Sequence, residues 1–357
     1  MQHADNFDDG EGYYRIITGE TVGEGNKYRI SSTLGKGVFS VVAKAVEVST
    51  EREVAIKLVR RNETMYKAGL KEVAILRKLQ DRDPRDRKHV IRLLGSFEHR
   101  GHLCMVFESM SMNLRDVLKK YGNNVGLNLK AVRLYAHQLF LALAHLRKSN
   151  IVHADLKPDN ILISEDRATI KLADLGSASD ASENDITPYL VSRFYRAPEI
   201  ILGISYDFSI DVWSAACTLY ELATGTILFP GRTNNHMLRM HMELKGPLAH
   251  KMIKRGLFGA KYFDERWQFA ATEIDRITGK EVVKHVQFAA AGAGTMRGRL
   301  GRAENRDEAR AQTALAELLE KCLALNPDKR LTPTDALKSA FIAGEGGGGG
   351  VGSEQSK

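Results

Sequence analysis

The stretch from Ile151 to Asn160 places a carboxylate, an ammonium group and a side-chain amide within six positions, at Asp155, Lys157 and Asn160. A carboxylate can orient a hydroxyl group and accept its proton, a lysine can steady a moving phosphoryl group, and oxygen ligands can hold magnesium. Transfer of a phosphoryl group to an alcohol needs these functions together. The spacing favours that chemistry, and an ordinary polar loop is the alternative when this stretch is taken alone.

Two glycine-containing stretches could bring phosphates near these groups. Gly35 and Gly37, within the stretch 34–42, let backbone amides approach phosphate oxygens without a Cβ in the way. We predict a strand after this stretch, whereas dinucleotide binding would require a helix there. A plain hairpin turn is the alternative. Farther along, Asp174 offers a second metal-binding carboxylate, and Gly176 lets the backbone turn beside it.

Lys57 ends the apolar run 54–57 and is a candidate for binding phosphates. A lysine among apolar neighbours is costly to bury without anionic partners. The phosphates of a nucleotide would supply such partners, and so would Glu72, which lies beside the apolar face of a predicted helix. A surface lysine at a strand end is the alternative.

The elements that must position these groups change character along the chain. Strands are predicted in residues 28–110 from the β-branched runs at 38–48 and 54–59 and the apolar runs at 91–94 and 103–107, giving a sheet of about five strands. Residues 70–79 have the period of an amphipathic helix. Helices are predicted at 113–121, 129–148 and 210–224, the last apolar nearly all round and ended by Gly225. The fold class is therefore α+β, with a strand-rich lobe (28–110) followed by a helical lobe (111–342).

The two ends and one internal segment have weaker patterns. Residues 1–27 are predicted to form a mostly polar extension, in which the apolar residues of the range 13–17 could add a short strand. Residues 289–310 favour a flexible insertion, and residues 343–357 favour a disordered glycine-rich tail.

Composition narrows the class of protein. The chain has 52 basic and 44 acidic residues, for a net charge of +8. Aspartates interleave with the basic cluster at 82–88, which favours a solvated basic surface over direct nucleic-acid binding. The three cysteines are far apart, which argues for a reducing compartment and against a disulfide framework or a zinc site. We find no secretory signal and no clean apolar span, so we expect a soluble intracellular protein.

Taken together, the motifs between Tyr28 and Ile342 resemble those of eukaryotic protein kinases. The resemblance implies a two-lobed fold, with a five-stranded antiparallel sheet plus helix C in the N-lobe, a mostly helical C-lobe, and ATP and Mg²⁺ between the lobes. It also implies an ion pair between Lys57 and Glu72, Asp155 as the catalytic base, and Asn160 and Asp174 as metal ligands. Lys157 beside Asp155 resembles serine/threonine kinases more than tyrosine kinases, and Lys57 and Lys157 complete the implied catalytic set.

The resemblance further implies an ATP-binding set in which Phe107 is the gatekeeper and Glu108 and Met110 lend backbone groups to adenine. The whole set comprises Leu34, Gly35, Lys36, Gly37, Val38, Val42, Ala55, Lys57, Glu72, Phe107, Glu108 and Met110. The resemblance also implies two structural interactions. Asp211 would hydrogen-bond the backbone of the catalytic loop, and Arg330 would pair with Glu199.

A closer resemblance rests on longer strings. Residues 192–199 are similar to the CMGC group of kinases, and residues 233–312 resemble the insert of that group. Five stretches resemble the pre-mRNA-processing factor four kinases: 11–15, 111–115, 153–155, 185–189 and 233–238. This family implies a nuclear location, splicing-factor substrates and phosphorylation of Tyr189, with Arg193 and Arg196 nearby as partners for the phosphate. A buried aromatic anchor is the alternative for Tyr189.

Three positions depart from the usual kinase pattern. Ser40 replaces a loop glycine, Leu175 replaces a phenylalanine, and Ala154 replaces the arginine that commonly clamps an activation-segment phosphate. None of the three removes a group that touches ATP, magnesium or the proton, so we predict an active enzyme. A pseudokinase scaffold and an RNA-binding module are the rival hypotheses. The expected partners are ATP and protein substrates, without a membrane, and we expect a monomer.

Overall fold

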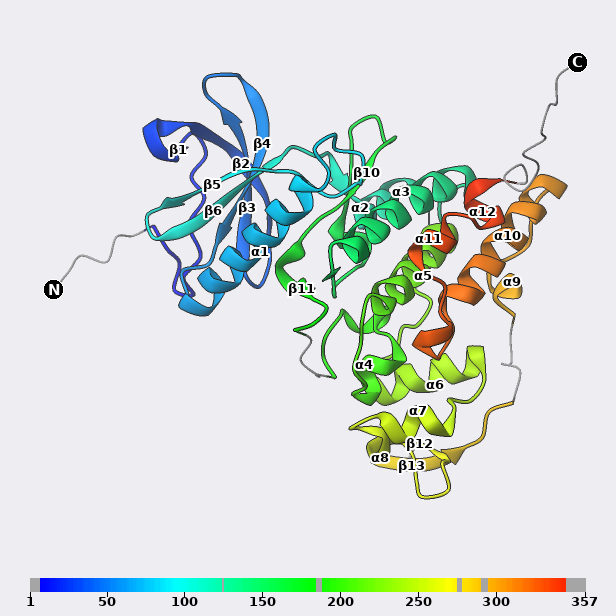
Figure 1. Ribbon diagram of the computed structural model, residues 1–357. Coiled ribbons are helices and arrows are strands. Elements are labelled where there is room, and N and C mark those ends of the chain that lie inside the picture. Colours follow the sequence, from blue (N-terminus) through cyan, green and yellow to red (C-terminus); the bar gives the residue numbers. More distant parts are fainter. Residues whose placement is uncertain (1–6, 124, 184–187, 275–277, 290–294, 345–357) are drawn as a thin grey trace, which may run out of the picture. The chain divides into compact units, whose positions relative to one another are not determined.

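The computed structural model describes residues 7–123, 125–183, 188–274, 278–289 and 295–344. The chain divides into two compact units (Figure 1). The first comprises Met1–Met112 and Leu162–Ala178, and the second comprises Asn113–Ile161 and Ser179–Lys357. The N-terminal extension therefore groups with the strand-rich unit. The segment Leu162–Ala178, which the sequence assigns to the helical lobe, groups with that unit too.

The first unit is built on an antiparallel sheet in the order β1-β2-β3-β4-β6-β5. Its strands are β1 (Thr21–Val22), β2 (Tyr28–Lys36), β3 (Ser40–Glu47), β4 (Arg52–Val59), β5 (Leu93–His99) and β6 (His102–Glu108). Val42 lies opposite Lys57, and Ala55 lies opposite Phe107. Because side chains alternate along a strand, these four residues share one face of the sheet. The intervening residues, such as Ala43 and Ile56, pack into a buried core on the other face.

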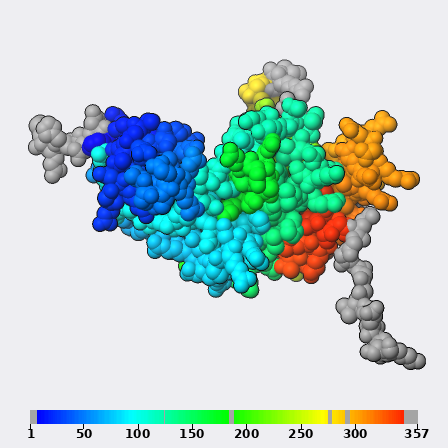
Figure 2. Space-filling view, turned by 90° about the horizontal axis from the view of Figure 1, so that it is seen from above, coloured from blue at the N-terminus to red at the C-terminus, as the bar shows by residue number. Residues whose placement is uncertain are grey.

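The sheet has a sixth strand beyond the five that the sequence predicts. This strand is β1, in which Thr21 and Val22 pair with Arg29 and Tyr28. The expected extra strand at 13–17 does not form, and Tyr14 makes only an isolated bridge to Asp8. Tyr14 and Val22 are both buried in the core on the far face of the sheet. The apolar residues of the extension thus cover that core, and the blue N-terminal residues form a continuous surface with the strands (Figure 2).

Helix α1 (Glu63–Asp81) is longer than the ten residues predicted for it. The side chain of Asn62 accepts hydrogen bonds from the backbone N–H groups of Thr64 and Met65, so it caps the helix well before the apolar face begins. Strand β5 also begins two residues later than expected, at Leu93. The unit is completed by β9 (Ile161–Ile163), β10 (Ile170–Leu172) and the 3₁₀ turn η3 (Leu175–Ser177).

The second unit is mainly helical, as expected. Helix α5 (Ser209–Thr224) is buried along nearly all of its length, and it ends at Gly225, whose φ of 73° is left-handed. Around it lie α2 (Leu114–Tyr121), α3 (Leu129–Lys148), α4 (Pro198–Leu202), α10 (Arg306–Cys322), α11 (Pro333–Ala336) and α12 (Ala340–Ala343). Short elements connect them: β7 (Met112–Asn113), β8 (Ile151–Val152), β11 (Ser179–Asp180), η2 (Pro158–Asn160), η4 (Arg193–Tyr195) and η5 (Pro327–Lys329).

The insert region is more ordered than the sequence suggests. Between α5 and α10 it contains α6 (Asn234–Lys245), α7 (His250–Arg255), α8 (Gly259–Tyr262), β12 (Phe269–Ile274), β13 (Glu281–Val286) and α9 (Met296–Arg299). The flexible insertion predicted at 289–310 is wrong for residues 295–310, which include α9 and the start of α10. Met296 is fully buried, and Asn305 caps α10, so both ends are anchored.

Some expectations fall outside the described residues. These are residues 290–294 of the insertion and residues 345–357 of the glycine-rich tail. Within the described ranges, every helix is too short or too polar to cross a membrane.

Candidate active site

The glycine-containing turn between β2 and β3 is open, as phosphate binding requires. A Cβ added at Gly35 would meet no atom within 4 Å, and one added at Gly37 would come no closer than 3.9 Å to the Ser40 carbonyl oxygen. The backbone N–H of Gly37 donates to that same oxygen (2.9 Å). Ser40 itself is buried and paired with Val59 in the sheet. A serine is therefore tolerated at this departure from the kinase pattern, because the position already belongs to the strand.

Lys57 lies between two carboxylates of the first unit. Its Nζ is 2.9 Å from both carboxylate oxygens of Glu72 on α1, and 2.9 Å from Oδ1 of Asp174. Burial disfavours the ammonium, but the charges of Glu72 and Asp174 outweigh that cost and raise the pKa of Lys57 above its ordinary value. The surface-lysine alternative is therefore excluded.

A space beside this ion pair is kept clear by a glycine. A Cβ at Gly176 would lie 3.3 Å from Oδ1 of Asp174, 3.5 Å from Oε2 of Glu72 and 3.8 Å from Nζ of Lys57. The side chain of Asp174 is 51% exposed. Oxygen donors and an adjacent ammonium suit a divalent cation and the phosphates that accompany it. The residue after Asp174, Leu175, is 1% exposed, so it keeps the packing role of the phenylalanine that it replaces.

The residues expected around adenine lie on or next to the same sheet face. Val42 and Ala55 are half-buried and Phe107 is buried there, while Leu34 and Val38 are exposed beside the glycine turn. The Glu108 carboxylate accepts hydrogen bonds from Lys171 Nζ (2.6 Å) and from the Arg92 backbone N–H (2.8 Å). These hydrogen bonds of the Glu108 side chain thus help to hold the end of β6 in place. Two residues farther on, the backbone of Met110 has no hydrogen-bond partner within the described ranges.

The backbone of the catalytic-loop segment is held by Asp211, a residue of α5. Both carboxylate oxygens of Asp211 accept backbone N–H groups, from His153 (2.8 Å) and Ala154 (3.0 Å). Burial raises the pKa of Asp211, and these hydrogen bonds oppose the rise. Ala154 adopts a left-handed φ of 62°. The loop therefore keeps its shape through Asp211 although the usual arginine is absent.

Four donors fix the Asp155 carboxylate. One oxygen accepts from the Ser192 backbone N–H (3.1 Å) and hydroxyl (2.6 Å), and the other accepts from Lys157 Nζ (2.7 Å) and the Asn160 amide (3.1 Å). Lys157 also donates to the Ser192 hydroxyl (2.9 Å). A serine hydroxyl thus donates directly to the carboxylate of Asp155. The motifs did not single out Ser192 as a functional residue, although it begins the string 192–199.

The amide of Asn160 is oriented for metal binding. Its nitrogen donates to the Asp155 carbonyl (2.8 Å) as well as to the carboxylate, which turns its oxygen away from both. An amide oxygen is an accepted ligand for magnesium. The predicted site residues thus form two groups: Lys57, Glu72 and Asp174 meet in the first unit, and Asp155, Lys157 and Asn160 meet in the second.

Arg115, which the motifs did not single out, links three segments of the second unit. Its guanidinium contacts the buried carboxylate of Glu221, the hydroxyl of Tyr195 (2.6 Å) and the carboxylate of Asp159 (3.2 Å). Asp159 precedes Asn160, and Tyr195 belongs to the segment that follows Ser192. One cation therefore links the catalytic loop, this segment and α5. Arg115 ends the string 111–115 that carries part of the family resemblance.

Tyr189, which the family resemblance implies as a phosphorylation site, is exposed and lies near Arg196. Tyr189 is 73% exposed, which excludes the buried-anchor alternative. The guanidinium of Arg196 lies 6.0 Å from the Tyr189 ring centre and donates to the backbone carbonyls of residues 189–191. Burial, with the neighbouring charge of Arg193, lowers the pKa of Arg196 to about 10. The residues 185–187 of the family string lie outside the described ranges.

Arg330 and Glu199 form the pair that the resemblance implies, with nitrogen–oxygen distances of 2.6 and 2.9 Å.

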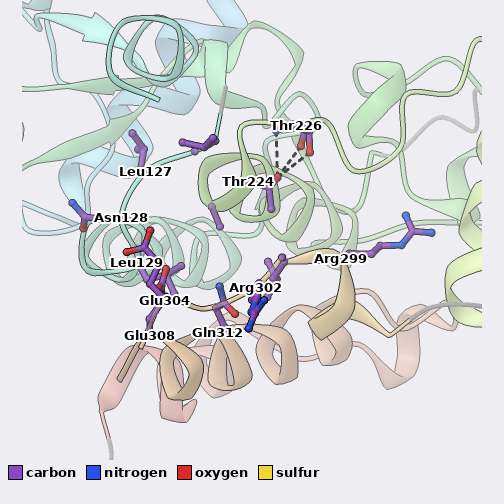
Figure 3. A pocket seen from close by; sticks show the side chains of 15 residues that line it. Leu127, Asn128, Leu129, Thr224, Thr226, Arg299, Arg302, Glu304, Glu308 and Gln312 are labelled. Atoms are coloured by element: carbon purple, nitrogen blue, oxygen red, sulfur yellow. Dashed lines mark hydrogen bonds between the residues drawn. The ribbon is translucent and has the colours of Figure 1, made fainter. Parts of the chain in front are cut away.

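A cavity of about 580 Å³ opens elsewhere in the second unit (Figure 3). It lies between the segment before α3, the end of α5 and the α9–α10 region, and Arg299, Arg302, Glu304 and Glu308 line it. None of the predicted site residues lines this cavity.

Comparisons with known proteins show the family of this chain. The model of the protein kinase domain family matches residues 28–342. The serine/threonine-protein kinase prp4 of Schizosaccharomyces pombe is 53% identical over 95% of this chain and 71% of that protein. The serine/threonine-protein kinase prpf4B of Dictyostelium discoideum is 46% identical over 95% of this chain, which spans only 42% of that protein. The serine/threonine-protein kinase ppk5 of S. pombe is 38% identical over 95% of this chain and 38% of that protein.

Proposed function

Since the chain belongs to the protein kinase domain family and is similar to serine/threonine kinases of the prp4 type, we propose that it phosphorylates serine or threonine residues of splicing factors, using magnesium–ATP. The observation that carries the catalytic part is the ion pair of Lys57 with Glu72, joined by Asp174 at 2.9 Å. These residues are far apart in the sequence, and a lysine paired with a helix glutamate, beside an aspartate that can hold a cation, is the arrangement that supports binding of nucleotide phosphates.

The proposed reaction assigns each group one task. The hydroxyl oxygen of the substrate forms a bond to the γ-phosphorus as the bond from that phosphorus to the β–γ bridging oxygen breaks, and ADP leaves. Asp155 orients the hydroxyl and accepts its proton, while Lys157 steadies the transferred group. Lys57 holds the α and β phosphates. Asn160 and Asp174 would hold magnesium, which neutralises charge on the phosphates when bound.

The splicing-factor substrates and a nuclear location rest on the family resemblance of the strings at 11–15, 111–115 and 233–238. Phosphorylation of Tyr189 is part of the same proposal, and it is supported by the exposure of that side chain and by the nearby Arg196. We propose that the phosphate would pair with Arg193 and Arg196, since Ala154 offers no charge.

Magnesium-dependent ADP release by the purified chain with a protein substrate tests the catalytic proposal. Asp155→Asn is expected to lower the rate by about 10²–10⁴-fold, because it removes a general base. Asp116→Asn on α2 alters an exposed carboxylate and serves as the matched control. Substantial phosphate transfer by Asp155→Asn would overturn the role of Asp155. Absence of turnover by the wild-type chain would favour the pseudokinase hypothesis, and tight, steeply salt-dependent RNA binding would favour the RNA-binding one.

Mapping phosphorylated sites after incubation with ATP and nuclear extract tests the substrate proposal. The expected result is new phosphoserine and phosphothreonine on splicing factors, together with phosphotyrosine at Tyr189. A set of targets without splicing factors would contradict it.

A further inference from the structure

The N-terminal extension forms a tight turn, residues 8–14, which we call the N-terminal turn. Its shape depends on Asp9, whose Oδ1 accepts the backbone N–H groups of Glu11 and Tyr13, both at 3.0 Å. The Asp9 N–H donates to the Tyr13 carbonyl (2.9 Å), and the Gly12 N–H donates to the Asp9 carbonyl (3.0 Å). Local hydrogen bonds thus shape this turn before it touches any other element.

The N-terminal turn contacts the glycine-containing turn on both sides of Gly37. The hydroxyl of Tyr13 donates to the carbonyl of Val38 (2.7 Å). The second carboxylate oxygen of Asp9 pairs with Lys36 Nζ (2.9 Å), and that ammonium lies 3.8 Å from the centre of the Tyr13 ring. In the described parts of the chain, these are the only side-chain hydrogen bonds found to residues 36–38.

The opposite side of the N-terminal turn is fastened to the end of β4. The Arg61 N–H donates to the Gly12 carbonyl (2.8 Å). Gly12 has a φ of 85°, and a Cβ there would lie 3.1 Å from the Arg61 carbonyl oxygen. Buried His102 bonds Asp8 (2.8 Å) through one ring nitrogen and the Val59 carbonyl (2.8 Å) through the other. The N-terminal turn is therefore a rigid bridge from β4 to the glycine-containing turn.

Such a bridge adds side-chain contacts to the backbone bonds of the hairpin, in which Lys36 pairs with Val41 and the Gly37 N–H donates to the Ser40 carbonyl (2.9 Å). Val38 and Phe39 at its tip are 67% and 57% exposed, and a Cβ added at Gly35 would meet no atom within 4 Å. A free glycine-rich segment loses much conformational entropy when it closes over a ligand. Contacts that restrict it beforehand reduce that loss and strengthen binding of whatever the turn receives.

We propose that Tyr13 and Asp9 are positioning residues for the nucleotide triphosphate: they hold residues 36–38 in the conformation that receives the phosphates of ATP. This inference rests on the proposed function. It assigns the N-terminal turn, residues 8–14, to the nucleotide site, although none of its side chains is expected to touch the nucleotide.

Calorimetric titration of the whole chain with magnesium–ATP and, separately, with adenosine tests the inference. Tyr13→Phe removes only the hydroxyl and is expected to raise the Kd for ATP about fivefold, the equivalent of one hydrogen bond. The Kd for adenosine should not change, because adenosine has no phosphates for the turn to receive. A merely structural role for Tyr13 would weaken both ligands or neither.

Tyr14→Phe is the matched control. It removes a neighbouring hydroxyl that donates to Glu20 (2.8 Å) and accepts from Arg100 (3.0 Å), away from the glycine-containing turn. We expect lower stability and an unchanged Kd for ATP. The inference would be overturned if Tyr13→Phe bound ATP as tightly as the wild type, or if Tyr14→Phe weakened ATP binding as much as Tyr13→Phe. Either result would leave the proposed function intact. Failure of the wild-type chain to bind ATP would instead overturn the proposed function.

Amide hydrogen exchange over residues 34–40 provides a second measurement. Without nucleotide, Tyr13→Phe is expected to exchange faster than the wild type in this segment and at the same rate in β5 and β6. Unchanged exchange in residues 34–40 would contradict the proposed restraint, and faster exchange throughout the first unit would show a loss of folding instead of a loss of positioning.

Discussion

Arg330 and Glu199 form a two-pronged ion pair in which both side chains are fully excluded from solvent. The two nitrogen–oxygen distances are 2.6 and 2.9 Å, and Arg330 also donates to the backbone carbonyls of Ser209 (2.7 Å) and Ala324 (3.1 Å). The pair thus joins α4, the start of α5 and the chain after α10. A buried charge that loses its partner has no water to replace it.

Arg330→Met is therefore expected to lower the free energy of unfolding by about 3–5 kcal/mol, because it leaves the Glu199 carboxylate buried and unpaired. Urea titration followed by tryptophan fluorescence measures this change. Lys338→Met breaks the exposed pair with Asp335 and should change stability by less than about 1 kcal/mol. Similar losses from both variants would refute the argument from burial.

Ser192→Ala should affect turnover more than folding. The variant removes a hydroxyl that donates to Asp155 and accepts from Lys157, so it loosens the carboxylate that we propose as the acceptor of the substrate proton. We expect kcat to fall roughly tenfold, as the loss of one hydrogen bond worth about 1.4 kcal/mol would produce. Ser192→Thr keeps the hydroxyl and should restore most of the rate. A threonine variant as slow as the alanine variant would contradict this role.

The burial of His241 predicts that the folded protein loses stability at acidic pH. It packs edge-on against Trp213 and Phe229, and neither ring nitrogen has a hydrogen-bond partner among the described residues. Burial, with the nearby charge of Arg330, lowers the pKa of His241 to about 3. A histidine in the unfolded chain has a pKa near 6.5. Between about pH 3 and pH 6.5, the unfolded chain therefore binds a proton at His241 that the folded chain does not bind.

Stability should therefore fall as the pH drops from about 6.5 towards 3, with His241 contributing up to about 1.4 kcal/mol per pH unit. Urea titrations at several pH values measure the slope. His241→Phe keeps the aromatic packing and should reduce the slope. An identical slope in His241→Phe and the wild type would count against this assignment.

Gly12→Ala tests the shape of the N-terminal turn. The left-handed φ of 85° and the close Arg61 carbonyl should cost about 1–2 kcal/mol of stability and weaken ATP binding as Tyr13→Phe does. Gly10→Ala is the matched control, since a Cβ there meets nothing within 4 Å. Thermal unfolding and ATP titration of the two variants give the comparison. A harmless Gly12→Ala would mean that the N-terminal turn tolerates another backbone path.

Most of the candidate site residues could be identified from the sequence because each motif is local. Asp155, Lys157 and Asn160 are close enough along the chain that one loop brings them together, and Gly225 ends α5 where its residue type predicts. The five core strands follow from β-branched and apolar runs, and α2, α3 and α5 follow from local apolar patterns, all of which depend on near neighbours. The start of α1 was missed because its first two turns have little apolar periodicity, although Asn62 is a typical cap.

The tertiary structure decided which distant residues meet. Nothing near Tyr13 in the sequence indicates Val38, and nothing near Asp155 indicates the hydroxyl of Ser192. The ordered insert and the strand β1 likewise depend on burial of Met296 and Val22 against residues far along the chain. The physical reason is that such contacts gain their free energy from excluding water between segments, and that gain depends on the whole packed fold instead of on the order of neighbouring side chains.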